Sequence, residues 1–345
     1  MSKAAAERRT RRLTNYLAAA ALLVAAPDRA ALPEPVSGDF SVPALDPGIR
    51  LHLRHRALPP QIALAPERVV LFVHGATFPS SSTFDAPLPG GSWMASVAAR
   101  GYDVYALDVR GYGGSTRPPA MSQPPADNPP FARTTEAVRD ISAAVDFILK
   151  RRGVRSLMLV GWSWGTTTTA AYAAESPGKV SRLVLFAPVW MGVQPVKYQG
   201  AYRTSTHESA RAFATAGIPG DRIDEISPPA LFDAWWKATQ ATDPDGARQA
   251  PPVVRSPNGV LQDFSELWAA GKPTYDPARI RAATLLIVGE WDVITPPIMA
   301  QTLYGRLTGA AERRLVLLSE GTHFMAVEKH RFRLMREVQN FLDGD

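Results

Sequence analysis

Short runs of apolar residues recur along this chain, separated by longer segments of mixed polarity. Each run has four or five residues and no charge, which is typical of a strand buried on both faces of a parallel sheet. The runs are residues 69–73, 104–107, 157–160, 183–187, 285–288 and 315–318. Residues 49–54 alternate between apolar and polar side chains instead. This alternation predicts a half-buried strand near a sheet edge.

The segments between these runs predict helices. The predicted helices cover residues 92–100, 134–152, 166–175 and about 326–342. Ser92 can cap the first of them, and Gly101 and Gly153 can occupy the left-handed position after a helix end. Strands separated by helices favour the α/β class, with a mainly parallel sheet covered by helices on both faces.

The regular alternation of strand and helix stops at Pro188 and returns near residue 280. Between them, proline and glycine interrupt helical pieces at residues 209–215, 229–239 and 262–270. We interpret the chain as an N-terminal extension or signal segment (1–40), a core (41–188 and 280–345) and a helical cap insertion (189–279). Residues 117–131 contain six prolines and predict a long loop of the kind that is often functional.

Composition excludes several classes of protein. The formal net charge is +6, but residues 1–12 carry five basic residues and one acid, which leaves only +2 for the rest. No basic run recurs, so nucleic-acid binding is not expected. The chain has no cysteine, which excludes disulfides and thiol catalysis. His52 and His55 fall on opposite faces of a strand, and we expect neither a metal nor a cofactor.

The N-terminus has the outline of a secretory signal. Basic residues precede an Ala/Leu-rich run over residues 16–26, which is too short to span a bilayer. Pro27 follows this run directly, and no Ala-x-Ala cleavage site is evident. Export and a cytoplasmic location both stay open, as does the oligomeric state, and no integral membrane span is predicted.

The pentapeptide Gly161-Trp162-Ser163-Trp164-Gly165 follows one of the apolar runs and precedes a predicted helix. A Gly-x-Ser-x-Gly sequence in this setting is typical of a sharp turn that lifts a serine out of a sheet for nucleophilic attack. The glycines are required because the turn leaves no room for side chains beside the serine. The helix that begins there favours developing negative charge.

A serine nucleophile needs a histidine to take its proton and a carboxylate to orient that histidine. Ser163, Asp292 and His323 each follow a predicted strand, and chemistry in parallel sheets collects at the carboxyl ends of strands. Residues 289–297 are similar to an acid loop and residues 321–324 to a histidine loop, and Asp108–Ser115 is similar to a segment of esterases and proline iminopeptidases. On these motifs, the chain resembles the α/β-hydrolase superfamily from about Ile49 onward.

The resemblance implies that the backbone N–H groups of Ala76 and Trp164 form an oxyanion hole. His74 is expected to hold the loop that carries Ala76. This loop departs from the Gly-Gly-Gly version of lipases, which argues against a lipase for bulky esters. Residues that could line the substrate pocket are Thr77, Trp162, Trp190, Trp235 and Trp236.

These residues predict a serine hydrolase that cleaves a small or medium carboxylic ester through an acyl-enzyme. Three alternatives stay open. One is an aminopeptidase of the proline iminopeptidase type, which would need cap carboxylates such as Glu225 and Glu266. The others are an acyltransferase and a non-catalytic ligand receptor on the same fold. Ser163 at the nucleophile position disfavours a haloalkane dehalogenase. Glu290 is the alternative candidate if Asp292 is not the acid.

Overall fold

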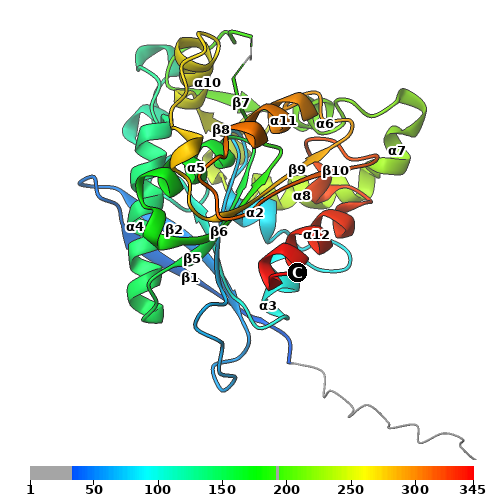
Figure 1. Cartoon of the computed structure of the whole chain (residues 1–345). Helices are drawn as coiled ribbons and strands as arrows, with labels where there is room; N and C mark the ends of the chain where they lie inside the picture. Colours follow the sequence, from blue (N-terminus) through cyan, green and yellow to red (C-terminus); the bar gives the residue numbers. More distant parts are fainter. Residues whose placement is uncertain (1–32, 192–193) are drawn as a thin grey trace, which may run out of the picture. The chain divides into compact units, whose positions relative to one another are not determined.

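The computed structural model describes residues 33–191 and 194–345, and the candidate signal segment lies outside them. An eight-stranded sheet runs through the middle of the described chain (Figure 1). Its strands, in spatial order, are β1 (Val36–Pro43), β2 (Arg50–Ala57), β4 (Asp103–Asp108), β3 (Val69–Val73), β5 (Leu157–Trp162), β6 (Val180–Phe186), β9 (Ala283–Gly289) and β10 (Arg313–Leu318).

The sheet is mainly parallel, which confirms the predicted fold class. From β4 to β10 every neighbouring pair is parallel, whereas β1 and β2 are antiparallel additions at one edge. The sequence pattern did not identify β1, which crosses residue 40, where the N-terminal extension was taken to end. The chain order reverses at β3, which lies between β4 and β5, and ligands of open α/β sheets bind at such a reversal.

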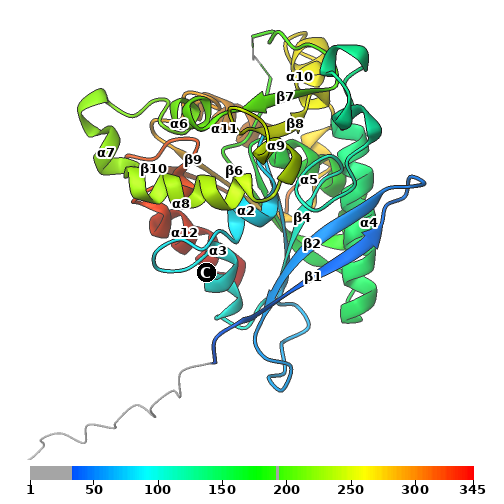
Figure 2. The same cartoon turned by 180° about the vertical axis from the view of Figure 1, so that it is seen from behind.

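Helices cover both faces of the sheet (Figures 1 and 2). Leu71 of β3 packs in the cluster that contains α4 (Thr134–Arg152) and α5 (Trp164–Glu175). Phe72 packs in the opposite cluster with α3 (Trp93–Ala98) and α12 (Arg331–Asp343). Burial of each such side chain contributes about 1.5–3 kcal/mol.

Two predicted helix ends need correction. The helix that Ser92 caps ends at Ala98 and not at Arg100. The last helix begins at Arg331 and not near residue 326, because the chain first forms a short 3₁₀ turn (Met325–Val327) and then folds Glu328 back toward Thr322. The predicted helix over residues 134–152 is confirmed, with Gly153 left-handed at φ 65°.

The sequence pattern predicted a helical segment from 189 to 279, but the structure also contains strands there. Two short strands, β7 (Tyr202–Ser205) and β8 (Val254–Pro257), pair antiparallel outside the main sheet. Its helices are α6 (His207–Ala214), α7 (Ile223–Ile226), α8 (Pro229–Gln240), α9 (Pro244–Ala247) and α10 (Gly259–Asp263), the last continued by a π turn (Phe264–Trp268). The strands are short and polar, so no apolar run marked them.

Two further helices complete the main unit. They are α2 (Ser80–Phe84) and α11 (Pro297–Arg306). The proline-rich stretch of residues 117–131 holds only short 3₁₀ turns, at Pro119–Ser122 and Pro125–Asp127. Helix α2 follows the loop after β3, and α11 follows the loop after β9, so each begins just beyond a strand end that carries candidate chemistry.

Candidate active site

Ser163 sits at the turn between β5 and α5 with a strained backbone. Its φ of 55° and ψ of −124° are rare for a residue with a side chain. A Cβ on Gly161 would lie 2.4 Å from the carbonyl oxygen of Gly165, and one on Gly165 would lie 2.3 Å from that of Val73. Both positions therefore require glycine. The serine itself is 8% exposed, beside the start of a helix.

Asp292 and His323 form a buried pair at the carboxyl ends of β9 and β10. His323 Nδ1 lies 2.9 Å from Asp292 Oδ2. The other carboxylate oxygen accepts the N–H groups of Ile294 (2.9 Å) and Thr295 (2.8 Å), and the Thr295 hydroxyl donates to Oδ2 at 2.8 Å. A carboxylate held in this way fixes the imidazole with Nδ1 protonated, which leaves Nε2 to accept a proton.

The serine turn and the histidine loop are joined through Trp162. Its indole N–H donates to the carbonyl oxygen of His323 at 3.0 Å, and its ring centroid lies 5.5 Å from the imidazole. Within the described residues, the Ser163 hydroxyl makes no hydrogen bond. Catalytic hydrogen bonds are often long without substrate and shorten in its presence.

The loop after β3 lies directly against the serine. A Cβ on Gly75 would come within 3.0 Å of the Ser163 Cβ. His74 Nδ1 is 2.6 Å from the Gly75 carbonyl oxygen, and its Nε2 accepts the Val109 N–H at 3.1 Å. Burial lowers the pKa of His74, so the ring stays neutral and keeps one donor and one acceptor. This geometry fits the role expected of His74, which is to hold the loop.

A buried carboxyl lies behind the histidine loop. Glu328 is fully buried, and its carboxylate accepts hydrogen bonds from the N–H (3.3 Å) and the hydroxyl of Thr322. Burial raises the pKa of Glu328 to about 7, hydrogen bonds from Thr322 oppose that shift, and the charge of Asp292 adds to it. No pattern in the sequence identified this residue, because a lone glutamate before a helix is unremarkable.

Comparison with known proteins decides the family. Residues 68–329 match the profile of the alpha/beta hydrolase fold. The chain belongs to this family. Human gastric triacylglycerol lipase is 30% identical over 126 residues, which are 36% of this chain and 32% of the lipase. Human lipase member K is 29% identical over 170 residues, which are 49% of this chain and 41% of that protein. These matches therefore span well under half of either lipase.

Solved structures share the fold of this alpha/beta hydrolase at low sequence identity. A serine hydrolase involved in carbazole degradation has a TM-score of 0.59 at 16% identity, with 89% of this chain and 99% of that chain covered. A thermophilic esterase from Thermogutta terrifontis has a TM-score of 0.58 at 16% identity, with 89% and 98% covered. Likeness at this identity establishes the architecture alone.

Three of the five residues proposed for the pocket, Trp162, Trp235 and Trp236, pack in one hydrophobic cluster. The Trp162 ring lies beside His323, and the Trp235 ring packs on Phe324 at 5.7 Å and on the Trp236 ring at 6.3 Å. Trp190 belongs to the other cluster and packs on Tyr275 at 5.5 Å. The half-buried Thr77 follows Ala76 and accepts a hydrogen bond from Arg203.

The sequence interpretation missed Phe213, whose ring centroid lies 6.1 Å from His323 and 5.1 Å from Phe324. Its position on the short amphipathic helix α6 was the available signal. Which apolar residues of that helix face the histidine depends on how the helix docks, and the sequence pattern does not contain that information.

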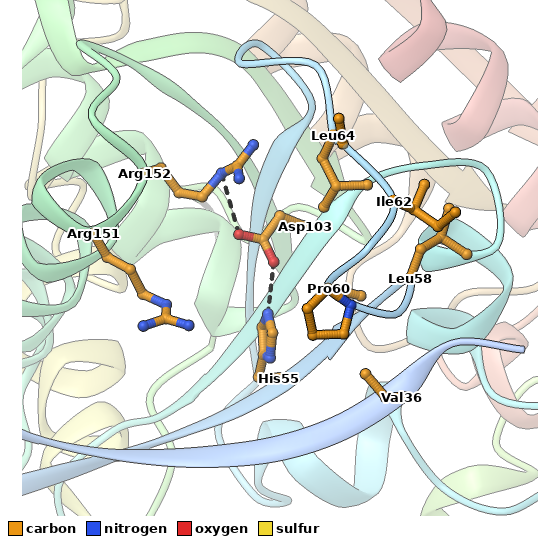
Figure 3. Close-up of a pocket in the computed structure, with 11 residues that line it drawn as sticks. Val36, His55, Leu58, Pro60, Ile62, Leu64, Asp103, Arg151 and Arg152 are labelled. Carbon is orange, nitrogen blue, oxygen red and sulfur yellow. Dashed lines mark hydrogen bonds and ion pairs between the residues drawn. The ribbon is translucent and has the colours of Figure 1, made fainter. Parts of the chain in front are cut away.

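A cavity of about 570 Å³ lies away from this hydrolase's serine. Figure 3 shows Asp103 on one wall, 2.6 Å from His55 Nε2 and 3.3 Å from Arg152 Nε. Asp103 begins β4, whereas Ser163 follows the end of β5, and the two strands run in the same direction on either side of β3. The cavity is therefore at the opposite end of the sheet and is not part of the candidate active site.

No helix in residues 33–191 and 194–345 is long and apolar enough to cross a membrane. The same residues contain no group of three or more acidic or histidine side chains that could hold a metal ion.

Proposed function

We propose that the protein is a serine hydrolase that cleaves small or medium carboxylic esters through an acyl-enzyme, with Ser163, His323 and Asp292 as its catalytic residues. The observation that carries this proposal is the Asp292–His323 pair at 2.9 Å, with Nε2 left free, at the same sheet edge as a serine in a strained turn. This is the arrangement that nucleophilic acyl transfer requires.

In the proposed mechanism, His323 Nε2 takes the proton of Ser163 as the hydroxyl attacks the ester carbonyl. The tetrahedral oxyanion is bound by the N–H groups of Ala76 and Trp164, for which no hydrogen-bond partner occurs in the described parts of the chain. His323 then protonates the leaving alcohol, and water activated by the same imidazole releases the acid. Each oxyanion donor is worth roughly 10²–10³ in rate.

Residues 189–279 are proposed to act as a cap over this site. Phe213 contacts the histidine loop, and a Cβ on Gly217 would lie 2.0 Å from the Trp291 carbonyl oxygen in the acid loop. Arg222 pairs with Glu320 at 2.6 Å, just before the histidine loop. A segment that touches these loops can exclude water and restrict the size of the acyl group.

The ester proposal is favoured over the aminopeptidase alternative because the candidate amine-binding carboxylates are already engaged. Glu225 pairs with Arg222 and Lys329, each at 3.0 Å, and Glu266 pairs with Arg133 at 3.0 Å. Both side chains are also close to half exposed, so neither is held inside a site. The names of the matched human proteins, both lipases, point toward ester substrates as well.

The test is hydrolysis of a series of nitrophenyl esters of increasing acyl length by the full chain and by Ser163→Ala. We expect serine-dependent turnover with a preference for short or medium acyl groups. Turnover that persists in a folded Ser163→Ala variant would overturn the proposal. Absence of ester turnover together with cleavage of proline arylamides would favour the aminopeptidase.

A further inference from the structure

The loop that carries Ala76 receives side chains from three separate elements. The Tyr112 hydroxyl and Arg203 Nη2 both donate to the Ala76 carbonyl oxygen, at 2.7 and 2.5 Å. Arg203 Nη2 also reaches the Thr77 hydroxyl at 3.0 Å, and the Ser256 hydroxyl donates to the Thr77 carbonyl oxygen at 2.6 Å. Arg203 and Ser256 are directly opposite each other on β7 and β8, so one small sheet supplies three of these four contacts.

The partners of Arg203 are neutral, as are those of the buried Arg331. Within the described residues, no carboxylate lies within 4.0 Å of the Arg203 guanidinium, whereas Arg255 pairs with Asp243 at 2.6 Å and Arg110 with Asp140 at 2.5 Å. Its second terminal nitrogen donates to the Pro257 carbonyl oxygen at 2.7 Å. The planar guanidinium therefore bridges β8 and the loop after β3 with a fixed geometry that an ammonium group could not supply.

These contacts fix the backbone on both sides of Ala76. His74 holds the Gly75 carbonyl, which belongs to the same peptide group as the Ala76 N–H. Tyr112 and Arg203 hold the Ala76 carbonyl, which belongs to the next peptide group. With both peptide planes held, φ and ψ of Ala76 are restricted, and so is the direction of its N–H. Burial raises the pKa of Tyr112, so its hydroxyl stays protonated and continues to donate.

We infer that Arg203 is a positioning residue that makes the oxyanion site depend on docking of the 189–279 segment. This inference rests on the proposed function. When the two-stranded sheet is seated, its arginine and serine hold the loop so that the Ala76 N–H faces the carbonyl attacked by Ser163. When the sheet moves away, the His74 and Tyr112 contacts remain, and the loop loses the three hydrogen bonds from Arg203 and Ser256. The segment thereby acts on the chemistry itself and not only on access to it.

The test measures kcat and KM for one nitrophenyl ester in wild type, Arg203→Met, Arg203→Lys, Tyr112→Phe and Ser256→Ala. We expect Arg203→Met to lower kcat about ten- to hundredfold, because misplacing a catalytic group by about 1 Å costs up to about a hundredfold. KM should change by less than about threefold if Ala76 acts mainly in the transition state. Arg203→Lys should recover part of the loss, and Tyr112→Phe and Ser256→Ala should give smaller losses of the same kind.

Tyr202→Phe is the matched control, because Tyr202 lies on the same small sheet and its hydroxyl donates to the Gln123 carbonyl oxygen at 3.0 Å without touching the loop. Hydrogen exchange over residues 75–78 gives a readout that does not need turnover, and it should accelerate in Arg203→Met and not in Tyr202→Phe. If Ser163→Ala abolishes turnover, the proposed function stands. Equal losses of kcat in both variants, or unchanged hydrogen exchange in Arg203→Met, would then overturn the inference alone. Turnover that did not depend on Ser163 would remove the proposed function and this inference with it.

Discussion

The strand-end loops of the main sheet and the 189–279 segment are built in different ways. Ser163 and Asp292 follow strands whose side chains are almost fully buried, whereas His323 follows the half-exposed edge strand β10, and the positions of all three are set by the backbone register of a parallel sheet. The 189–279 segment has one two-stranded sheet and short helices, held in place by aromatic packing and by ion pairs such as Asp243–Arg255 at 2.6 Å.

This difference suggests a division of labour. A hydrophobic sheet gives rigid placement, which suits groups that must meet within a few tenths of an ångström. A polar, multiply connected segment can dock and undock at a smaller cost, which suits control of access and substrate size. Changes in the main sheet should therefore alter the rate for all substrates alike, and changes in the segment that leave its contacts with the Ala76 loop intact should alter the preference among substrates.

The largest effect is expected from Asp292→Asn. Loss of the carboxylate removes the group that holds His323 with Nδ1 protonated, and kcat should fall roughly 10³–10⁴-fold for every acyl length. Steady-state kinetics across the ester series measures this. The matched control is Glu290→Gln in the same loop, for which we expect less than about a twofold change. If Glu290→Gln caused the larger loss, the acid would be wrongly assigned.

Asp243→Ala should loosen the 189–279 segment. Asp243 is fully buried and accepts hydrogen bonds from Arg255 Nε (3.0 Å), Arg255 Nη2 (2.6 Å) and the Gly246 N–H (3.2 Å). Its removal leaves a buried arginine poorly compensated, at a cost of about 3–5 kcal/mol. Hydrogen exchange should accelerate over residues 243–257 before it changes in the main sheet. The control is Asp233→Ala, an exposed partner of His207, and equal effects of the two variants would contradict the prediction.

Glu328→Gln should change how stability depends on pH. The folded-state pKa of Glu328 is raised from 4.5 to about 7, so between these values the folded chain binds more protons than the unfolded chain. Stability contributed by protonated Glu328 is therefore complete below pH 4.5 and is lost as the pH rises to 7, by about 3 kcal/mol in total.

Glutamine stays neutral, so the variant should lose less stability than wild type between pH 4.5 and 7.5. Denaturant unfolding at several pH values measures the difference. Glu337→Gln, on the outer part of α12, should leave the pH dependence of wild type unchanged. Parallel curves for wild type and Glu328→Gln would show that the buried carboxyl does not titrate in this range.

The smallest effect is expected from Phe213→Ala. Loss of the ring beside His323 and Phe324 enlarges the space next to the imidazole, so kcat/KM for long acyl chains should rise relative to short ones by about tenfold. The ratio is measured with the same ester series on wild type and Phe213→Ala. Phe332→Ala removes an exposed aromatic ring elsewhere and should leave the ratio unchanged. An equal drop for all chain lengths would place Phe213 with the catalytic groups and would contradict the proposed division of labour.

The sequence by itself determined the fold class and the site candidates near strand ends. Uncharged apolar runs predicted the strands of the parallel sheet, although the run at 315–318 forms the half-exposed edge strand β10, and glycines on both sides of Ser163 are required wherever the backbone adopts that turn. Because parallel strands end at one edge, residues that follow different runs can be assigned to one site without knowing the packing. The edge strand β1 was missed because Gly38 and Asp39 interrupt its apolar residues, and only its Val42 is buried.

Only the tertiary structure decided which parts of the 189–279 segment reach the strand-end loops. The docking of α6 brings Phe213 to His323, and the pairing of β7 with β8 brings Arg203 and Ser256 to the loop of Ala76. The fold also places Glu328 against Thr322. Helices and strands have fixed residue periods, so the pattern of apolar residues in the sequence predicts them. Contacts between distant short elements depend on shape, on polar partners and on burial, which no period in the sequence records.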